Sequence, residues 1–184
     1  MSNETKASLP LGIVVERRAV DNRWISHSWR ATAVIVGAPP RSPSDEWTLL
    51  RQGDGWAQFH AGTLSLDLFR KETEAYKLNL SQDPPRLYVV LRDDDEPGSP
   101  HEVVPFLVTA SPYEAQDYLD SGEDQVDAAP MPDAITAFVQ DFIARHHVDE
   151  PFRKRQRTRA DTGDEAFARR PDALRKREGD VGDG

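Results

Sequence analysis

The chain has 184 residues, no cysteine, and 32 acidic against 23 basic side chains, which gives a formal net charge of −9. The lack of cysteine excludes structural disulfides, thiolate zinc sites, cysteine-ligated iron–sulfur clusters and a cysteine nucleophile. The negative charge argues against nucleic-acid binding by the folded body, because phosphate contacts need concentrated Lys and Arg. Residues 1–8 lack the apolar core of a secretory signal, and no apolar run reaches the ~18–20 residues that span a bilayer. We therefore expect a cytoplasmic protein without membrane contact.

The composition changes after residue 148. Residues 1–148 carry 13 Lys and Arg against 23 Asp and Glu, whereas residues 149–184 carry 10 against 9 with almost no aliphatic side chains. A segment with so little apolar surface cannot offset the entropy of the chain. We predict a flexible N-terminus over 1–8, one β-rich domain over 9–148 that is long enough to bury a core, and a disordered tail, basic at first and then of mixed charge, over 149–184.

Alternating apolar and polar residues predict strands in the first half of the domain. The segment 9–20 reads as the first strand, and 29–36 fits a second. A hairpin is expected over 47–61, around the turn sequence Gly53-Asp54-Gly55. The segment 64–70 alternates leucine with polar residues, which predicts a separate strand with one buried face.

Three more strands are expected in the middle of the chain. The alternation over 76–80 predicts one, and 87–91 is apolar on both faces, which indicates a central strand. After an acidic turn at 93–98, the segment 104–108 predicts another. About seven consecutive strands without intervening helices imply antiparallel pairing.

Two helices are expected to close the domain. Residues 111–114 form a capping box with proline at the first helical position, and Gly122 is a suitable stop. We expect Ala115, Tyr118 and Leu119 to face the sheet. The second helix carries one buried stripe at helical spacing: Ile135, Phe138, Val139, Phe142, Ile143 and His146. The predicted fold class is α+β, with a mainly antiparallel sandwich or partly open barrel and two C-terminal helices.

The sequence predicts neither catalytic residues nor a metal site. His146 and His147 are adjacent on a helix and point about 100° apart, so a histidine pair at a helix C-terminus is favoured over two ligands of one ion. The acidic run 93–96 lacks the ligand pattern of a calcium loop and is interpreted as a solvated turn. No nucleophile elbow or nucleotide loop occurs.

Partner binding is the remaining kind of site. All four tryptophans lie in the N-terminal third, where core packing and an exposed partner-binding face are both open. A basic arm follows the second helix, and it could be a solubilising tail, a dock for an acidic protein surface, or a nucleic-acid contact. The predicted partner-binding residues are Trp24, Trp29, Phe152, Arg153, Lys154, Arg155 and Arg157.

A set of short motifs covers about residues 9–157. They lie at 12–18, 22–24, 29–30, 68–76, 85–92, 111–116, 130–132, 146–147, 151–152 and 154–155. Together they resemble a bacterial family of unknown function whose genes typically sit beside those of molybdenum-containing formate dehydrogenases and their maturation factors.

The resemblance implies an accessory protein that helps to assemble such a dehydrogenase, or to deliver its cofactor, by binding a dehydrogenase subunit or a maturation factor. Some members are labelled molybdopterin-guanine dinucleotide biosynthesis proteins, which implies a nucleotidyltransferase as the alternative, and a small structural subunit of the complex is a third. No catalytic residue can be carried over from the family. We expect no cofactor of the protein's own, and contact with molybdopterin stays open.

Overall fold

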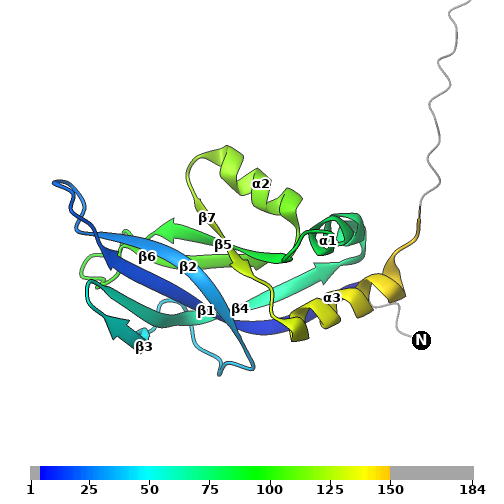
Figure 1. Cartoon of the computed structure of the whole chain (residues 1–184), viewed down its shortest axis with the longest axis horizontal. Coiled ribbons are helices and arrows are strands. Elements are labelled where there is room, and N and C mark those ends of the chain that lie inside the picture. Colours follow the sequence, from blue (N-terminus) through cyan, green and yellow to red (C-terminus); the bar gives the residue numbers. More distant parts are fainter. Residues whose placement is uncertain (1–4, 150–184) are drawn as a thin grey trace, which may run out of the picture. The chain divides into compact units, whose positions relative to one another are not determined.

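Seven strands form two antiparallel sheets in the computed structural model, which describes residues 5–149 (Figure 1). Sheet A has the order β2-β1-β4-β3, and sheet B has the order β6-β5-β7. Every neighbouring pair is antiparallel, which confirms the predicted α+β class. The strands are β1 (Lys6–Ala19), β2 (His27–Val36), β3 (Thr48–Gly53), β4 (Trp56–Phe69), β5 (Arg86–Asp93), β6 (Val103–Thr109) and β7 (Gln125–Pro130).

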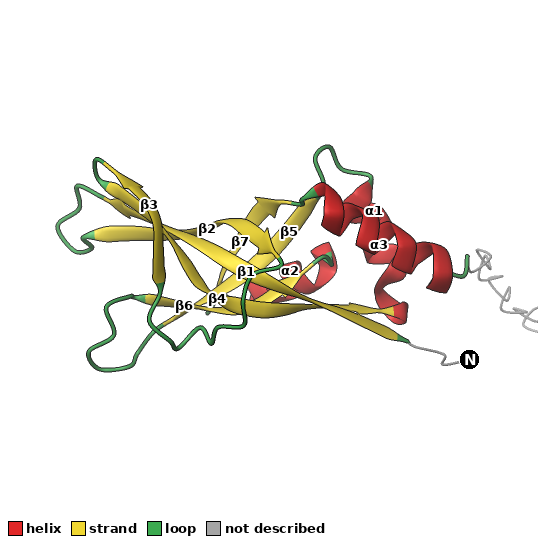
Figure 2. Cartoon of the chain, turned by 90° about the horizontal axis from the view of Figure 1, so that it is seen from below, coloured by secondary structure: helices red, strands yellow, loops and turns green. Residues whose placement is uncertain are grey.

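The two sheets make an open sandwich in which β4 lies beside β6 and β2 lies beside β7 (Figure 2). Leu11, Ile13 and Val15 of β1 are fully buried between the sheets, as their alternation predicts. Leu87 and Val89 of the central strand β5 are also fully buried, so sheet B contributes to the same core.

Helices cover one end of the sandwich and one face of sheet B. They are η1 (Arg70–Glu72), α1 (Thr73–Leu80), α2 (Pro112–Ser121) and α3 (Asp133–His146). The predicted cap of α2 is confirmed, because the Ser111 hydroxyl accepts a hydrogen bond from the Glu114 amide and Gly122 ends the helix in a left-handed conformation. The predicted stripe of α3 is confirmed too, with Ile135 and Phe142 almost fully buried.

Three local predictions are wrong. The segment 76–80 belongs to helix α1, where the buried residues Thr73, Tyr76 and Asn79 follow a helical spacing of three. The stretches expected as a hairpin arm and a separate strand form the single strand β4, with a register shift in its pairing to β1. Leu119 points to solvent instead of the sheet.

Two further differences concern the order of elements. Strand β7 lies between α2 and α3, so the two C-terminal helices are not consecutive, and α1 separates β4 from β5. Strand β1 begins at Lys6, inside the stretch 1–8 that was expected to be flexible. The predicted tail from residue 150 onward lies outside the described residues.

The connection from β2 to β3 determines which part of sheet A stays accessible. These strands lie at opposite edges of the sheet, so residues 37–47 must cross β1 and β4. Glycines permit the crossing: a Cβ on Gly12 would lie 2.7 Å from the Ala38 Cβ, and one on Gly62 would lie 2.7 Å from the Pro43 Cα. Within residues 5–149, no helix is long and apolar enough to cross a membrane.

Candidate partner-binding site

The turn of the β1–β2 hairpin presents an exposed indole. Trp24 is 86% exposed, and Ile25 beside it is 50% exposed. The backbone is held in place because the Asn22 side chain accepts a 2.8 Å hydrogen bond from the Trp24 amide. The Arg23 guanidinium lies 5.8 Å from the centre of the Trp24 ring. The hairpin therefore offers a large apolar side chain on an ordered turn.

Trp29, the second tryptophan predicted to bind a partner, lies in the core. Only 7% of its surface is exposed, and its indole N–H donates a 2.8 Å hydrogen bond to the Glu102 carboxylate. Its ring meets the buried Trp47 edge-on, with 5.8 Å between centroids. Trp29 thus packs between the sheets, and of the two residues Trp24 alone stands at the surface.

His101 completes the aromatic cluster around Trp47. Its ring stacks on the Trp47 indole with centroids 3.7 Å apart and planes 10° from parallel. Burial, and secondly the nearby Arg17 charge, lower the pKa of His101 below its ordinary value. Within residues 5–149 its buried Nδ1 has no hydrogen-bond partner. The ring is therefore held as a neutral aromatic surface near neutral pH.

A cavity of about 600 Å³ lies beside this stack, between the loops 43–47 and 94–101. Its size falls in the range of small-molecule sites. Four carboxylates line it together with Trp47 and His101: Asp45, Glu46, Asp94 and Glu96. Such a lining repels anions, because like charges at short range raise each other's energy.

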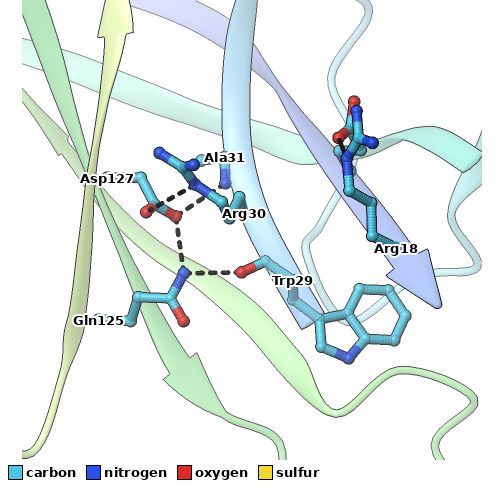
Figure 3. Close-up of polar contacts among 7 residues, drawn as sticks. Arg18, Trp29, Arg30, Ala31, Gln125 and Asp127 are labelled. Atoms are coloured by element: carbon cyan, nitrogen blue, oxygen red, sulfur yellow. Dashed lines mark hydrogen bonds and ion pairs between the residues drawn. The ribbon is translucent and has the colours of Figure 1, made fainter. Parts of the chain in front are cut away.

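The joint between β2 and β7 is made by side chains of β7 (Figure 3). The Ala31 amide donates a 2.9 Å hydrogen bond to the Asp127 carboxylate, and the Gln125 side chain donates one of 2.7 Å to the Trp29 carbonyl. Gln125 also donates a 2.8 Å bond to Asp127, whose other oxygen lies 3.8 Å from the Arg30 Nε. Two side chains therefore satisfy β2 backbone groups that a neighbouring strand would otherwise pair.

A hydrogen-bond chain crosses the outer face of sheet A. The Arg18 Nε donates to one oxygen of Glu16 at 2.6 Å, and the Gln58 amide donates to the other at 2.7 Å. The Arg51 Nε donates to the Gln58 carbonyl oxygen at 2.7 Å. Burial alone would raise the pKa of Glu16, but the bonds from Gln58 and Arg18 outweigh it and hold the pKa below its ordinary value.

A model of a family of proteins of unknown function, DUF3305, matches residues 10–156. The chain belongs to this DUF3305 family. No curated protein and no solved structure matches the chain. The DUF3305 match covers the domain and continues into the basic arm as far as Gln156, beyond the residues that the structure describes.

The other predicted sites are placed as follows in this DUF3305 protein. His146 packs against Phe142, with 4.5 Å between ring centroids, and His147 follows the helix end with its Nδ1 3.0 Å from the Thr73 hydroxyl. In the described part of the chain, no group of three or more potential metal ligands occurs. The predicted arm residues lie outside the described part: Phe152, Arg153, Lys154, Arg155 and Arg157.

The residues that join the two sheets, and those that form the hydrogen-bond chain on sheet A, were not predicted from the sequence. Asp127 and Gln125 lie in a strand that was not predicted, and the chain Arg18–Glu16–Gln58–Arg51 depends on strand register. One signal was available for part of it. Glu16 and Arg18 are two residues apart in a predicted strand, and such residues share a face.

Proposed function

We propose that this protein is an accessory protein for a molybdenum-containing formate dehydrogenase, acting in the cytoplasm by binding the immature enzyme or one of its maturation factors. The observation that carries the binding part is the nearly complete exposure of Trp24 on the ordered hairpin turn. The identity of the partner rests on the resemblance to a family whose genes sit beside those of such dehydrogenases.

Trp24 has the properties of an interface anchor. Tryptophan is among the residues that contribute most to binding energy, because its large rigid ring buries much area at a low cost in side-chain entropy. The hydrogen bond from Asn22 reduces the ordering that the turn would need on binding. Ile25 adds apolar surface beside the ring, and Arg23 supplies a charge over it.

The alternative is an enzyme of molybdopterin-guanine dinucleotide biosynthesis, and the cavity beside Trp47 and His101 is the feature that would serve it. Its carboxylates disfavour nucleotide phosphates unless magnesium neutralises them. Calorimetry with a guanine nucleotide and magnesium decides the matter: heat of binding that disappears on changing Asp94 and Glu96 to Asn and Gln would favour the enzyme.

The decisive experiment is co-purification from the native host at low salt. Tagged wild-type protein is expected to recover a formate dehydrogenase subunit or maturation factor, and Trp24→Ala is expected to lose most of it. Tyr113→Ala is the matched control, because Tyr113 is also an exposed aromatic residue but lies on α2. Recovery of neither protein by the wild type would refute the proposal.

A genetic measurement distinguishes a maturation role from a structural one. Deletion of the gene is expected to lower the molybdenum content of the purified formate dehydrogenase, and the wild-type gene is expected to restore it. A gene carrying Trp24→Ala should restore less than one carrying Tyr113→Ala. Stoichiometric presence of the protein in the active purified enzyme would instead indicate a permanent small subunit.

A further inference from the structure

Three arginines and a tryptophan lie together on the outer face of sheet A. Glu16 is directly opposite both Arg30 and Gln58, and Gln58 is opposite Arg51, so these four residues form one row across four strands. The next row places Arg18 opposite Trp56. We call the surface formed by Arg18, Arg30, Arg51 and Trp56 the arginine face.

Two guanidinium groups of the arginine face are paired with carboxylates that are much more buried than the arginines. Side chains of Arg18 and Arg30 are 62% and 70% exposed, whereas their carboxylate partners Glu16 and Asp127 are 13% and 9% exposed. Arg18 and Arg51 each use only Nε for hydrogen bonds to residues in the range 5–149. Their terminal NH₂ groups therefore remain available to donate hydrogen bonds to a planar carboxylate.

Trp56 forms the apolar floor between Arg18 and Arg51. The indole lies directly over Gly53, where a Cβ would come within 2.3 Å of the Trp56 Nε1. The Arg51 guanidinium lies 5.8 Å from the Trp56 ring centroid. Glycine at position 53 thus lets the Trp56 ring approach the strand closely, with the Arg51 guanidinium beside it.

Among residues 5–149, no helix covers this end of sheet A. Helices α1 and α3 lie at the opposite end of the sheet, and α2 lies beyond sheet B (Figures 1 and 2). The crossing loop passes over β1 at Gly12, which is four residues from Glu16 along the strand. The arginine face is therefore an exposed sheet surface on which three arginines outnumber the two carboxylates paired with them, Glu16 and Asp127. It lies on a domain that carries ten more acidic than basic residues, 23 against 13 over 1–148.

We propose that the arginine face docks an acidic, extended segment of a partner protein. The row from Arg30 to Arg51 spans three interstrand spacings, about 14 Å, which equals the length of about four residues of extended chain. Carboxylates at positions i and i+4 of such a segment would reach Arg30 and Arg51, and one at i+2 would lie nearest Arg18. The net negative charge of the domain opposes a nucleic acid, whose phosphates extend far beyond the face.

This inference goes beyond the proposed function, because it specifies the chemistry of a partner and not its identity. It is tested with the purified full-length protein and no dehydrogenase, so its failure is separate from failure of the co-purification. The probe is a short fluorescein-labelled peptide of alternating Glu and Ser, measured by fluorescence anisotropy. The wild type is expected to bind it at low salt and to release it as screening increases.

The arginine double variant R18Q/R51Q is expected to weaken binding of this peptide about tenfold, because two charge-assisted contacts are lost. A matched variant, K71Q/R145Q, removes the same net charge elsewhere on the body and is expected to bind the peptide as the wild type does. A second variant, R153Q/R155Q, tests the basic arm as the competing site for the peptide. A loss with K71Q/R145Q equal to that with R18Q/R51Q would assign the binding to net charge, and an equal loss with R153Q/R155Q would assign it to the arm; either result would overturn the proposal.

A second measurement needs no variant. In the wild-type protein, the peptide is expected to shift the Nε–Hε NMR signals of Arg18, Arg30 and Arg51 and to leave that of Arg145 in place. Absence of binding, shifts confined to other arginines, or tighter binding of a single-stranded oligothymidylate than of the acidic peptide would each contradict an acidic protein segment as the occupant.

Discussion

Replacing Asp127 with alanine is expected to open the joint between β2 and β7. The Asp127 carboxylate is nearly buried, and it accepts hydrogen bonds from the Ala31 amide and the Gln125 side chain. Ala31 is itself 2% exposed, so its amide has no access to bulk water as a replacement. The variant would leave a buried donor without an acceptor, which is the costly way to lose a hydrogen bond.

The magnitude follows from these contacts. A buried amide left unsatisfied costs about 1–3 kcal/mol, and a hydrogen bond to a charged group contributes about 1.5–3 kcal/mol. These terms overlap for the Ala31–Asp127 pair, so we expect Asp127→Ala to lower the free energy of unfolding by about 3 kcal/mol. Asp127→Asn keeps one oxygen as an acceptor, and we expect a loss of about 1 kcal/mol.

Urea denaturation followed by tryptophan fluorescence measures the global loss, and amide hydrogen exchange at Ala31 measures the local one. Asp141→Ala is the control, because it removes a carboxylate whose ion pair with Arg145 is exposed on α3 and should change stability little. The assigned role of Asp127 is refuted if Asp127→Ala costs no more stability than Asp141→Ala, or if the Ala31 amide keeps its wild-type protection from exchange.

Three further predictions concern packing, capping and pH. Gly12→Ala should cost about 1–3 kcal/mol in thermal or urea unfolding, because its Cβ would lie 2.7 Å from that of Ala38; adding Ala38→Gly should recover part of the loss. Ser111→Ala removes the N-cap of α2 and should lower the free energy of unfolding by about 1 kcal/mol in the same assay. The helix signal should also decrease if the cap orders the helix. Burial lowers the pKa of His101 and also of His60, so the unfolded chain binds protons more readily. The stability that comes from keeping these two histidines neutral should therefore be fully present above about pH 6.5. It should be lost as the pH decreases below that value. His101→Phe should flatten the pH dependence of the urea midpoint, and an unchanged slope would contradict the assignment.

Local signals were sufficient for much of the fold. Leu11, Ile13 and Val15 are buried at every second position, and any strand with one buried face must show this spacing. The capping box at Ser111 and the stop at Gly122 act within one helical turn, so they could be identified without knowledge of the rest of the chain.

Helix α1 could not be identified in this way. Tyr76 and Leu78 alternate with polar residues as in a strand, yet Leu78 is exposed and Asn79 is fully buried. The Asn79 amide group donates to the carbonyls of Arg86 and Ala110, so partners distant from the helix stabilise its burial. A prediction from apolar residues alone places such an asparagine at the surface, and it therefore assigns the wrong face of the segment to the core.

Strand β7 was missed for a related reason. Its inward positions are occupied by Asp127 and Ala129, which carry little of the β-branched and aromatic character that marks a strand. The carboxylate is stabilised there by groups of β2, about a hundred residues earlier in the chain. The arginine face depends likewise on the registers of three strand pairs, which no spacing along the chain contains.

The joint and the arginine face are linked through one short segment of β2. Three consecutive residues of β2 contact side chains of β7: Trp29 through its carbonyl, Arg30 through its guanidinium, and Ala31 through its amide. Because Arg30 is directly opposite Glu16, a displacement of β2 from Asp127 would also move one end of the arginine row. Gln125→Ala removes joint bonds to the Trp29 carbonyl and to Asp127 without changing the charge beside Arg30, so it should weaken binding of the acidic peptide somewhat. Gly12→Ala, which perturbs the covered part of the same sheet, should affect stability more than peptide binding. A Gln125→Ala protein that is less stable but binds the peptide as the wild type does would show that the joint supports the fold alone.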